Sequence, residues 1–162
     1  MKLHIENINI TLPQQLPAGL IAALAIAGAT KPASKVNVPA IGEKWPGLDA
    51  IYAGVALSKD EGRLVHLILY TDDPRKGMAY EKAVEYAEGV NPEMDSHIPT
   101  RHQSITLFER LRDQFDKDWV HWTLTKTKDG KTAFYQHFSD GDQVSIFLSA
   151  ECRVRAVSEI QL

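Results

Sequence analysis

The chain has 162 residues, 44% of them hydrophobic and 24% charged, and a formal net charge of -3. This composition predicts one globular domain with a hydrophobic core, and the slightly acidic balance disfavours duplex nucleic acid and anionic membranes as partners. Cys152 is the only cysteine, so no internal disulfide can form. We expect a cytoplasmic protein in which this thiol is a buried, structural side chain.

Residues 1–44 are predicted to form an N-terminal extension and connector to the main domain at 45–162. The near-alternation of apolar residues over 3–12 predicts a strand or hairpin. Residues 16–29 are strongly apolar, but they are fewer than the ~20 that span a bilayer, and no short basic segment precedes them. They therefore predict a buried helix rather than a membrane span or a signal peptide.

The middle of the chain combines strand and helix patterns. Branched and aromatic residues predict strands at 51–57 and 64–70, joined by the polar turn at 58–62. Apolar residues at helical spacing predict a helix at 78–90 and a second helix that follows Ile98-Pro99-Thr100-Arg101 and runs to about Phe115. Either Thr100 or His102-Gln103-Ser104 is expected to cap the second helix.

The C-terminal part reads as a run of short strands, at 119–125, 132–138, 144–150 and 153–157. Asp129-Gly130 and Asp140-Gly141 are strong hairpin signals between them. Together these elements predict an α+β domain with a mainly antiparallel sheet and two or three helices.

Motifs for common enzyme sites are missing from the sequence. It has no glycine-rich phosphate loop and no Gly-x-Ser-x-Gly elbow. Asp95, His97 and His102 form the nearest approach to a ligand cluster, but their spacing fits no common zinc motif. The acidic pairs Asp72-Asp73 and Asp140/Asp142 are better explained by turns than by calcium, so no metal or cofactor is expected.

A series of short motifs separated by turn residues runs along the chain. They are Trp45-Pro46-Gly47, Tyr52-Ala53-Gly54-Val55, His66-Leu67-Ile68-Leu69, Ile98-Pro99-Thr100-Arg101, Trp119-Val120-His121-Trp122-Thr123, Phe138-Ser139-Asp140-Gly141-Asp142-Gln143 and Arg153-Val154-Arg155-Ala156-Val157. Their order resembles the phage and bacterial family of unknown function numbered 1566 (DUF1566, Lcl C-terminal-like). That resemblance implies a C-type lectin-like fold of the sulfatase-modifying-factor superfamily.

The resemblance also implies where a partner would bind. Relatives of this fold present a variable recognition face on their C-terminal strands and loops, where this chain combines aromatic and polar side chains suited to protein contacts. The residues of this predicted surface are Trp119, His121, Lys126, Lys128, Asp129, Lys131, Tyr135, His137, Asp140, Asp142 and Gln143. Trp119 and Trp122 have an alternative interpretation as core residues.

The sequence therefore favours a non-enzymatic, phage-encoded protein that binds a host or phage protein, with inhibition of a host defence factor as one setting. A virion accessory or receptor- and glycan-recognition module is the alternative. A weaker alternative is an enzyme of a new type that acts through His97, His102 or His121 and needs a concave pocket with a perturbed titratable group. Arg153 and Arg155 are expected to be structural ion-pair donors.

Overall fold

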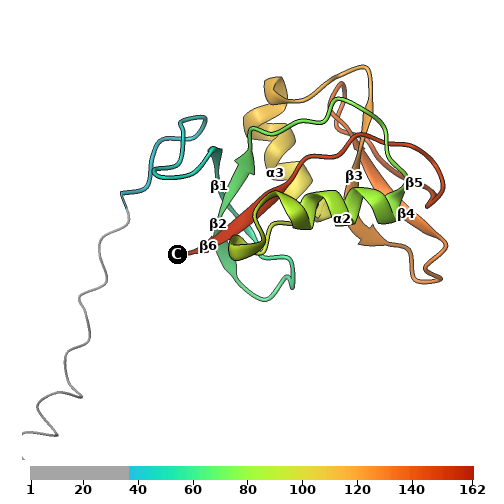
Figure 1. Cartoon of the computed structure of the whole chain (residues 1–162), viewed down its shortest axis with the longest axis horizontal. Helices are drawn as coiled ribbons and strands as arrows, with labels where there is room; N and C mark the ends of the chain where they lie inside the picture. Colours follow the sequence, from blue (N-terminus) through green and yellow to red (C-terminus); the bar gives the residue numbers. More distant parts are fainter. Residues whose placement is uncertain (1–36) are drawn as a thin grey trace, which may run out of the picture. The chain divides into compact units, whose positions relative to one another are not determined.

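The computed structural model describes residues 37–162, and Asn37–Leu162 forms one compact unit (Figure 1). The strand or hairpin predicted at 3–12 and the helix predicted at 16–29 lie outside the described residues. The remaining chain contains two α-helices, two 3-10 turns and two antiparallel sheets of three strands each. This mixture confirms the predicted α+β class.

The first sheet has the strand order β1-β2-β6. Strands β1 (Ala50–Leu57) and β2 (Leu64–Tyr70) form the predicted hairpin, and β6 (Val157–Gln161) pairs with the other edge of β2. Figure 1 shows β6 and β2 side by side although they are far apart in the sequence. Gly54 lies in a bulge of β1 with φ of 97°, a backbone conformation that glycine adopts without a Cβ clash.

The second sheet has the strand order β3-β4-β5 and is a meander of two hairpins. Its strands are β3 (Val120–Lys126), β4 (Thr132–His137) and β5 (Gln143–Phe147). Gly130 and Gly141 have positive φ at the two turns, as the Asp-Gly signals predict. The third strand ends at Phe147, three residues before the predicted end at Ala150, because Ala150 N–H turns back to Phe147 O at 2.9 Å.

Two helices pack against these sheets. Helix α2 (Tyr80–Val90) begins two residues later than predicted, because Met78 exchanges backbone hydrogen bonds with Cys152. It is followed by the 3-10 turn η1 (Pro92–Met94). Helix α3 (Arg101–Leu111) continues as the 3-10 turn η2 (Arg112–Gln114).

Of the two caps that the sequence offered for α3, the structure has Thr100 as the N-cap residue. Thr100 accepts a hydrogen bond from Gln103 N–H, while the Gln103 side chain accepts one from Thr100 N–H at 2.9 Å. This reciprocal capping box satisfies two N–H groups that the first helical turn leaves unpaired.

The strand predicted at 153–157 is wrong, because β6 begins only at Val157. Arg153 bonds the backbone of β3, with its N–H on Val120 O at 2.8 Å, whereas Ala156 O already accepts from Tyr70 N–H of β2 at 3.0 Å. The segment thus changes its partner sheet within three residues, which is too short for a continuous ladder. It joins the two sheets and is buried, as expected for Cys152, Val154 and Ala156.

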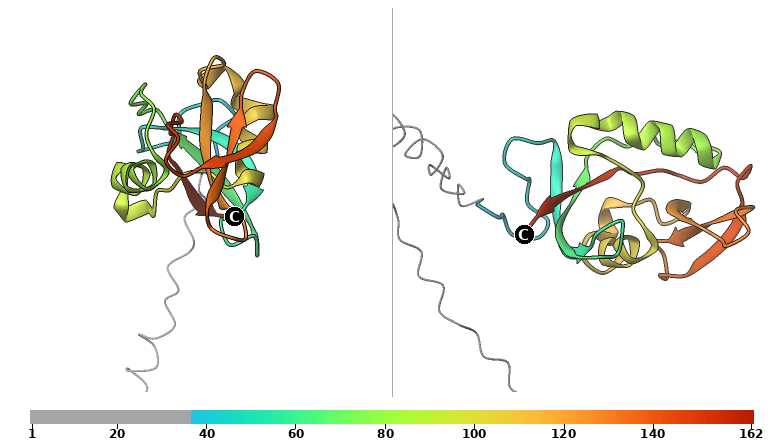
Figure 2. Two further views of the ribbon diagram at one scale, coloured as in Figure 1. Left: turned by 90° about the vertical axis from the view of Figure 1, so that its right-hand side faces the viewer. Right: turned by 90° about the horizontal axis from the view of Figure 1, so that it is seen from below.

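The two helices cover opposite sides of the domain, as the right-hand view of Figure 2 shows. On the α2 side, Trp122 of β3 meets Tyr80 edge-on with ring centroids 5.3 Å apart, and its Nε1 donates to Met78 O at 2.8 Å. On the α3 side, Leu107 and Leu111 pack with Phe115 and Phe138. Because each sheet lies between packed elements, both of its faces carry buried residues.

Candidate functional site

Strand pairing assigns the predicted surface residues to two different faces of the β3-β4-β5 sheet. Tyr135 of β4 lies opposite Trp122 on β3 and Val144 on β5, so these three side chains share one face. Gln143 lies opposite Gln136 on the other face. We call the first the α2 face, because Trp122 packs on that helix, and the second the α3 face.

The α2 face carries a pair of aromatic rings. Tyr135 and His137 are two residues apart on β4, and their rings meet edge-on with centroids 5.5 Å apart. Both are half-buried, and Val144 beside Tyr135 is 49% exposed. Val120 lies opposite His137 and is half-buried too. We call Val120, Tyr135, His137 and Val144 the ring-pair patch, which offers amphipathic contact area at low conformational cost.

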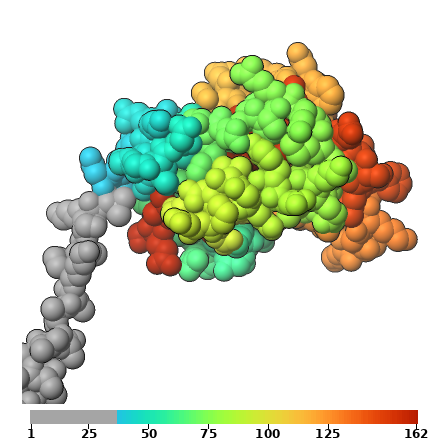
Figure 3. All heavy atoms as spheres, in the orientation of Figure 1, coloured from blue at the N-terminus to red at the C-terminus, as the bar shows by residue number. Residues whose placement is uncertain are grey.

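The tip of the β3–β4 hairpin holds a separate, charged group. Lys128, Asp129 and Lys131 are all exposed. Asp129 Oδ1 accepts from Thr127 Oγ1 at 2.6 Å and from Lys131 N–H at 3.1 Å, and these bonds lower the Asp129 pKa. The carboxylate therefore holds the turn, and the two lysines extend into solvent. Figure 3 shows this C-terminal part of the chain at one margin of the molecule.

Lys126, the last residue of β3, is exposed and contacts helix α2. Its Nζ lies 2.9 Å from Glu81 Oε1 and 4.7 Å from the centre of the Tyr80 ring. The lysine thus connects β3 to α2 by an ion pair and a cation–π contact.

His121 does not belong to a recognition surface, because it is only 4% exposed. It lies on the α3 face, where Phe115 and Phe138 meet its ring edge-on at 5.2 and 5.1 Å. Burial, followed by the positive charge of Arg155, lowers the His121 pKa from 6.5 to about 3. The ring is therefore neutral at physiological pH and forms part of the core.

Gln143 also has a structural role on the α3 face. Its Nε2 donates to Arg101 O at 2.9 Å and Gln136 Oε1 at 2.7 Å, while its Oε1 accepts from Arg101 Nε at 2.8 Å. The Arg101 guanidinium lies 3.9 Å from the centre of the Phe134 ring. These contacts attach the β4–β5 hairpin to the first turn of α3.

The β4–β5 turn positions two exposed acids. Asp140 Oδ1 accepts from Asp142 N–H at 3.0 Å, and this bond lowers the Asp140 pKa. Asp142 O accepts from His137 N–H at 2.8 Å, but its carboxylate has no recorded hydrogen-bond partner within residues 37–162. Asp140 therefore shapes the turn, as Asp129 does in the other hairpin, and the Asp142 side chain is available to solvent.

Trp119 is 45% exposed and directly precedes Val120 of the ring-pair patch. The Arg153 guanidinium is 5.3 Å from the centre of its ring, and Arg153 Nη2 is 2.9 Å from Asp116 Oδ2. Trp122 is the core tryptophan of this strand, at 1% exposed. Trp119 is thus partly exposed, as expected for a surface residue, whereas Trp122 fits the alternative interpretation as a core residue.

Arg155 is the deepest charged side chain on the described C-terminal segment, at 4% exposed. Its Nη1 donates to Gln114 O at 2.5 Å and its Nη2 to Tyr70 O at 2.7 Å. Asp73 Oδ2 lies 3.9 Å from Nη1. Together with the Arg153–Asp116 pair, these contacts confirm the expectation that both arginines are structural donors.

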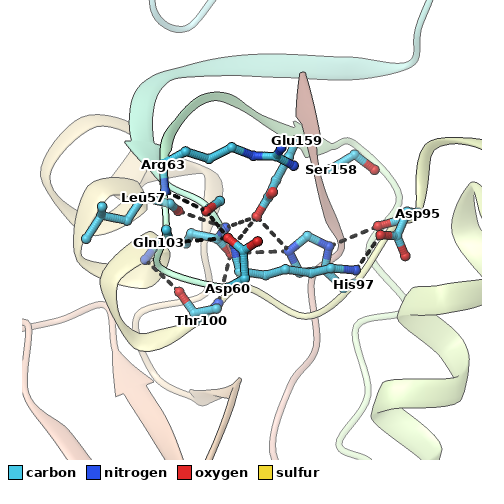
Figure 4. Close-up of polar contacts among 12 residues, drawn as sticks. Leu57, Asp60, Arg63, Asp95, His97, Thr100, Gln103, Ser158 and Glu159 are labelled. Carbon is cyan, nitrogen blue, oxygen red and sulfur yellow. Dashed lines mark hydrogen bonds and ion pairs between the residues drawn. The ribbon is translucent and has the colours of Figure 1, made fainter. Parts of the chain in front are cut away.

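A buried polar network, which the sequence analysis did not predict, joins the first sheet to α3. Figure 4 shows the His97 ring between Asp95 and the Gln103–Glu159 pair. His97 Nδ1 lies 3.0 Å from Asp95 O, and its Nε2 lies 3.3 Å from Gln103 Oε1. Gln103 Nε2 donates to Glu159 Oε1 at 2.7 Å and to Leu57 O at 3.1 Å. The sequence offered Gln103 only as part of possible capping material, and nothing in it pairs Gln103 with β6.

A cavity of about 150 Å³ opens beside this network. Its charged lining mixes signs: Lys59 and Arg63 come from the β1–β2 turn, whereas Asp60, Asp95 and Glu159 supply carboxylates. Lys59 N–H bonds Glu159 Oε1, and Lys59 Nζ pairs with Asp95. The polar groups are thus engaged with one another, and His97 is only 5% exposed, an arrangement that fixes the loops around β6.

The other candidates for chemistry are placed apart from this cavity. His102 is exposed on α3 and bonds Glu61 at 2.8 Å. Cys152 is 1% exposed, and burial raises its pKa to about 12, which confirms the structural thiol. Within residues 37–162 no three His, Cys, Asp or Glu side chains are grouped to hold a metal ion.

Among the helices of the described region, none combines the length and the apolar character that crossing a membrane requires.

Comparison with known protein-family models and with curated proteins found no match to this chain.

Proposed function

We propose that this protein is a non-enzymatic, phage-encoded binding protein that recognises a host protein in the cytoplasm of the infected cell. The contact surface is the ring-pair patch of Val120, Tyr135, His137 and Val144. The proposed effect of this binding is to block a host defence factor. The sequence resemblance to the DUF1566 family, which implies a C-type lectin-like fold, supports this proposal.

One observation carries the proposal: Tyr135 and His137 form an ordered ring pair that is only partly buried. Each ring has apolar carbon surface and a polar group, and the edge-on contact at 5.5 Å restricts the rotation of both. Val144, 49% exposed, extends the apolar area across to β5. Aromatic side chains of this kind are the usual energetic centre of a protein–protein interface.

Capture of a partner from host lysate by the tagged full chain tests the proposal. The decisive variant is Tyr135→Ala combined with His137→Ala, and the matched control is Lys128→Ala on the charged hairpin tip. The control should retain a specific partner, and the double variant should lose it with at least a tenfold fall in affinity for the purified partner, as expected for interface centres.

Thermal unfolding of each variant establishes that the fold is intact. Failure of the wild-type chain to retain any specific partner would overturn the proposal. So would equal retention by the folded double variant, because the partner would then contact another surface.

A further inference from the structure

Within residues 37–162, strand β5 is the edge of its sheet, and it contains no charged residue. The sheet order β3-β4-β5 places it outermost, and its sequence is Gln143-Val144-Ser145-Ile146-Phe147. Val144 is 49% and Phe147 69% exposed. Edge strands of monomers are commonly protected by lysine, proline or a bulge, and β5 carries none of these.

The outward backbone groups of β5 can be identified from its pairing with β4. Asp142 O accepts from His137 N–H at 2.8 Å, so the carbonyl of Asp142 faces β4. Alternation along an antiparallel strand then directs the N–H and C=O of Gln143, Ser145 and Phe147 away from β4. In the part of the chain that the structure describes, no backbone partner is recorded for Gln143 or Ser145 on that outer side.

We propose that β5 pairs antiparallel with β5 of a second copy of this chain, about a two-fold axis at Ser145. This register uses the outward groups of Gln143 and Ser145 and the N–H of Phe147 in both copies, because Phe147 O already accepts from Ala150 N–H. It also places Val144 opposite the second copy's Ile146 on the α2 face, and Phe147 opposite the second copy's Gln143 on the α3 face. The two sheets become one sheet of six strands, and this self-association can be tested without the proposed host partner.

The charged residues at the two ends of β5 favour a second copy of this chain as the partner and antiparallel pairing of the two strands. The ladder between β4 and β5 ends where Thr132 pairs with Phe147, so Lys131 adjoins one end of β5, and Asp142 adjoins the other. An antiparallel second copy brings its Asp142 to the end of β5 that Lys131 adjoins. Lys131 and the second copy's Asp142 are then about two strand spacings, roughly 10 Å, apart between backbones.

A lysine and an aspartate together can span that separation. Both side chains are exposed, and neither has a recorded hydrogen bond or ion pair within residues 37–162. The two-fold axis makes the contact twice, once at each end. Parallel pairing would instead bring the two Asp142 side chains together, and the two Lys131 side chains together, which like-charge repulsion disfavours.

The interface is small, so the dimer should be weak and depend on concentration. Two five-residue strands and their side chains bury less surface than a stable protein interface requires. Sedimentation equilibrium of the full chain from about 10 µM to about 1 mM should therefore show a reversible monomer–dimer equilibrium.

Charge exchange between copies gives the sharper test. Lys131→Glu alone and Asp142→Lys alone each create two like-charge contacts, so each variant should dimerise at least fivefold more weakly than the wild type. An equimolar mixture of the two should recover dimers, because a mixed pair again places an acid opposite a lysine at both ends. Both positions are exposed, and only the backbone of each contributes to its turn.

Val144→Lys provides a second test, in the strand itself. This variant should dimerise more weakly than the wild type, and mixing it with either charge variant should not restore the dimer. A wild-type chain that stays monomeric up to about 1 mM would overturn the inference. Dimers that form equally well in Lys131→Glu, in Asp142→Lys and in their mixture would overturn it too, because another surface would then hold them.

Discussion

His97 Nε2 lies 3.7 Å from Glu159 Oε1, so the loop before α3 and strand β6 meet through two side chains that are almost fully buried. The same carboxylate oxygen accepts from Gln103 Nε2 at 2.7 Å and from Lys59 N–H. Glu159 therefore accepts hydrogen bonds from two segments, α3 and the β1–β2 turn, and lies beside a third at His97.

Replacement of this acceptor should destabilise the fold. Glu159→Ala leaves the buried Gln103 amide and Lys59 N–H without their partner, and we expect a loss of about 1–3 kcal/mol in the free energy of unfolding. Urea denaturation of the variant measures it. Glu85→Ala on the exposed side of α2 is the control and should change stability by less than about 0.5 kcal/mol. Equal stability of the two variants would contradict the role of the network.

The buried imidazole of His121 should make the fold sensitive to acid. Its pKa is about 3 in the folded state and 6.5 when the chain is unfolded, so the unfolded state takes up the proton between these values. Stability is therefore complete above pH 6.5 and falls as the pH decreases toward 3, by on the order of 2 kcal/mol at pH 5. Urea denaturation at pH 7.5 and pH 5 measures the loss.

His121→Leu is the matched comparison, because leucine keeps an apolar side chain against Phe115 and Phe138 but has no proton to bind. Its free energy of unfolding should change less between pH 7.5 and pH 5 than that of the wild type. An identical decrease in both proteins would assign the acid sensitivity to other groups.

Arg155→Met should be more costly than its conservative volume suggests. The guanidinium satisfies Gln114 O and Tyr70 O inside the protein, and methionine cannot donate to either. We expect a loss of about 2–4 kcal/mol, measured by chemical denaturation. Arg63→Met removes an exposed guanidinium and should have a much smaller effect. The prediction is wrong if both substitutions cost the same.

Two glycines should respond to alanine with opposite signs. Gly141 has φ of 94°, and a Cβ there would lie 2.9 Å from Phe108 Cε1, so Gly141→Ala should lower stability by about 1–3 kcal/mol. Gly89 lies in α2 with open space around it, so Gly89→Ala should raise stability by about 0.5–1 kcal/mol. Thermal unfolding of both variants measures the contrast, and stabilisation by Gly141→Ala would contradict the strained turn.

Local sequence signals predicted much of the fold. Strand β2 was predicted at residues 64–70, where the structure has it, because a run of branched residues is bounded by turn residues at both ends. The cap at Thr100 and the Asp-Gly turns depend on neighbouring residues alone. Strand β6 was missed because its identity depends on pairing with β2, and the sequence of residues 157–161 by itself gives a weak signal.

The candidate surface was harder to predict, for a physical reason that His121 and Gln143 illustrate. Alternation along a strand separates two faces, but it indicates exposure only when one face is open to water. Here α3 and Phe115 cover the second face as well, so a polar residue at an outward position becomes a buried ring or an amide bonded to Arg101. Single-strand patterns cannot show that a distant helix returns to cover them.

Tyr70 Oη and Ser158 Oγ lie 3.1 Å apart across 88 positions of sequence, and the pairing of β2 with β6 has consequences for how the chain folds. During folding the outer edge of β2 stays open until β6 reaches it, and β2 is among the most apolar strands of the protein. Contacts of such long sequence separation form slowly, and an apolar open edge can pair with another unfolded chain in the meantime. Refolding yield should therefore decrease with protein concentration more steeply than the small size of the domain suggests.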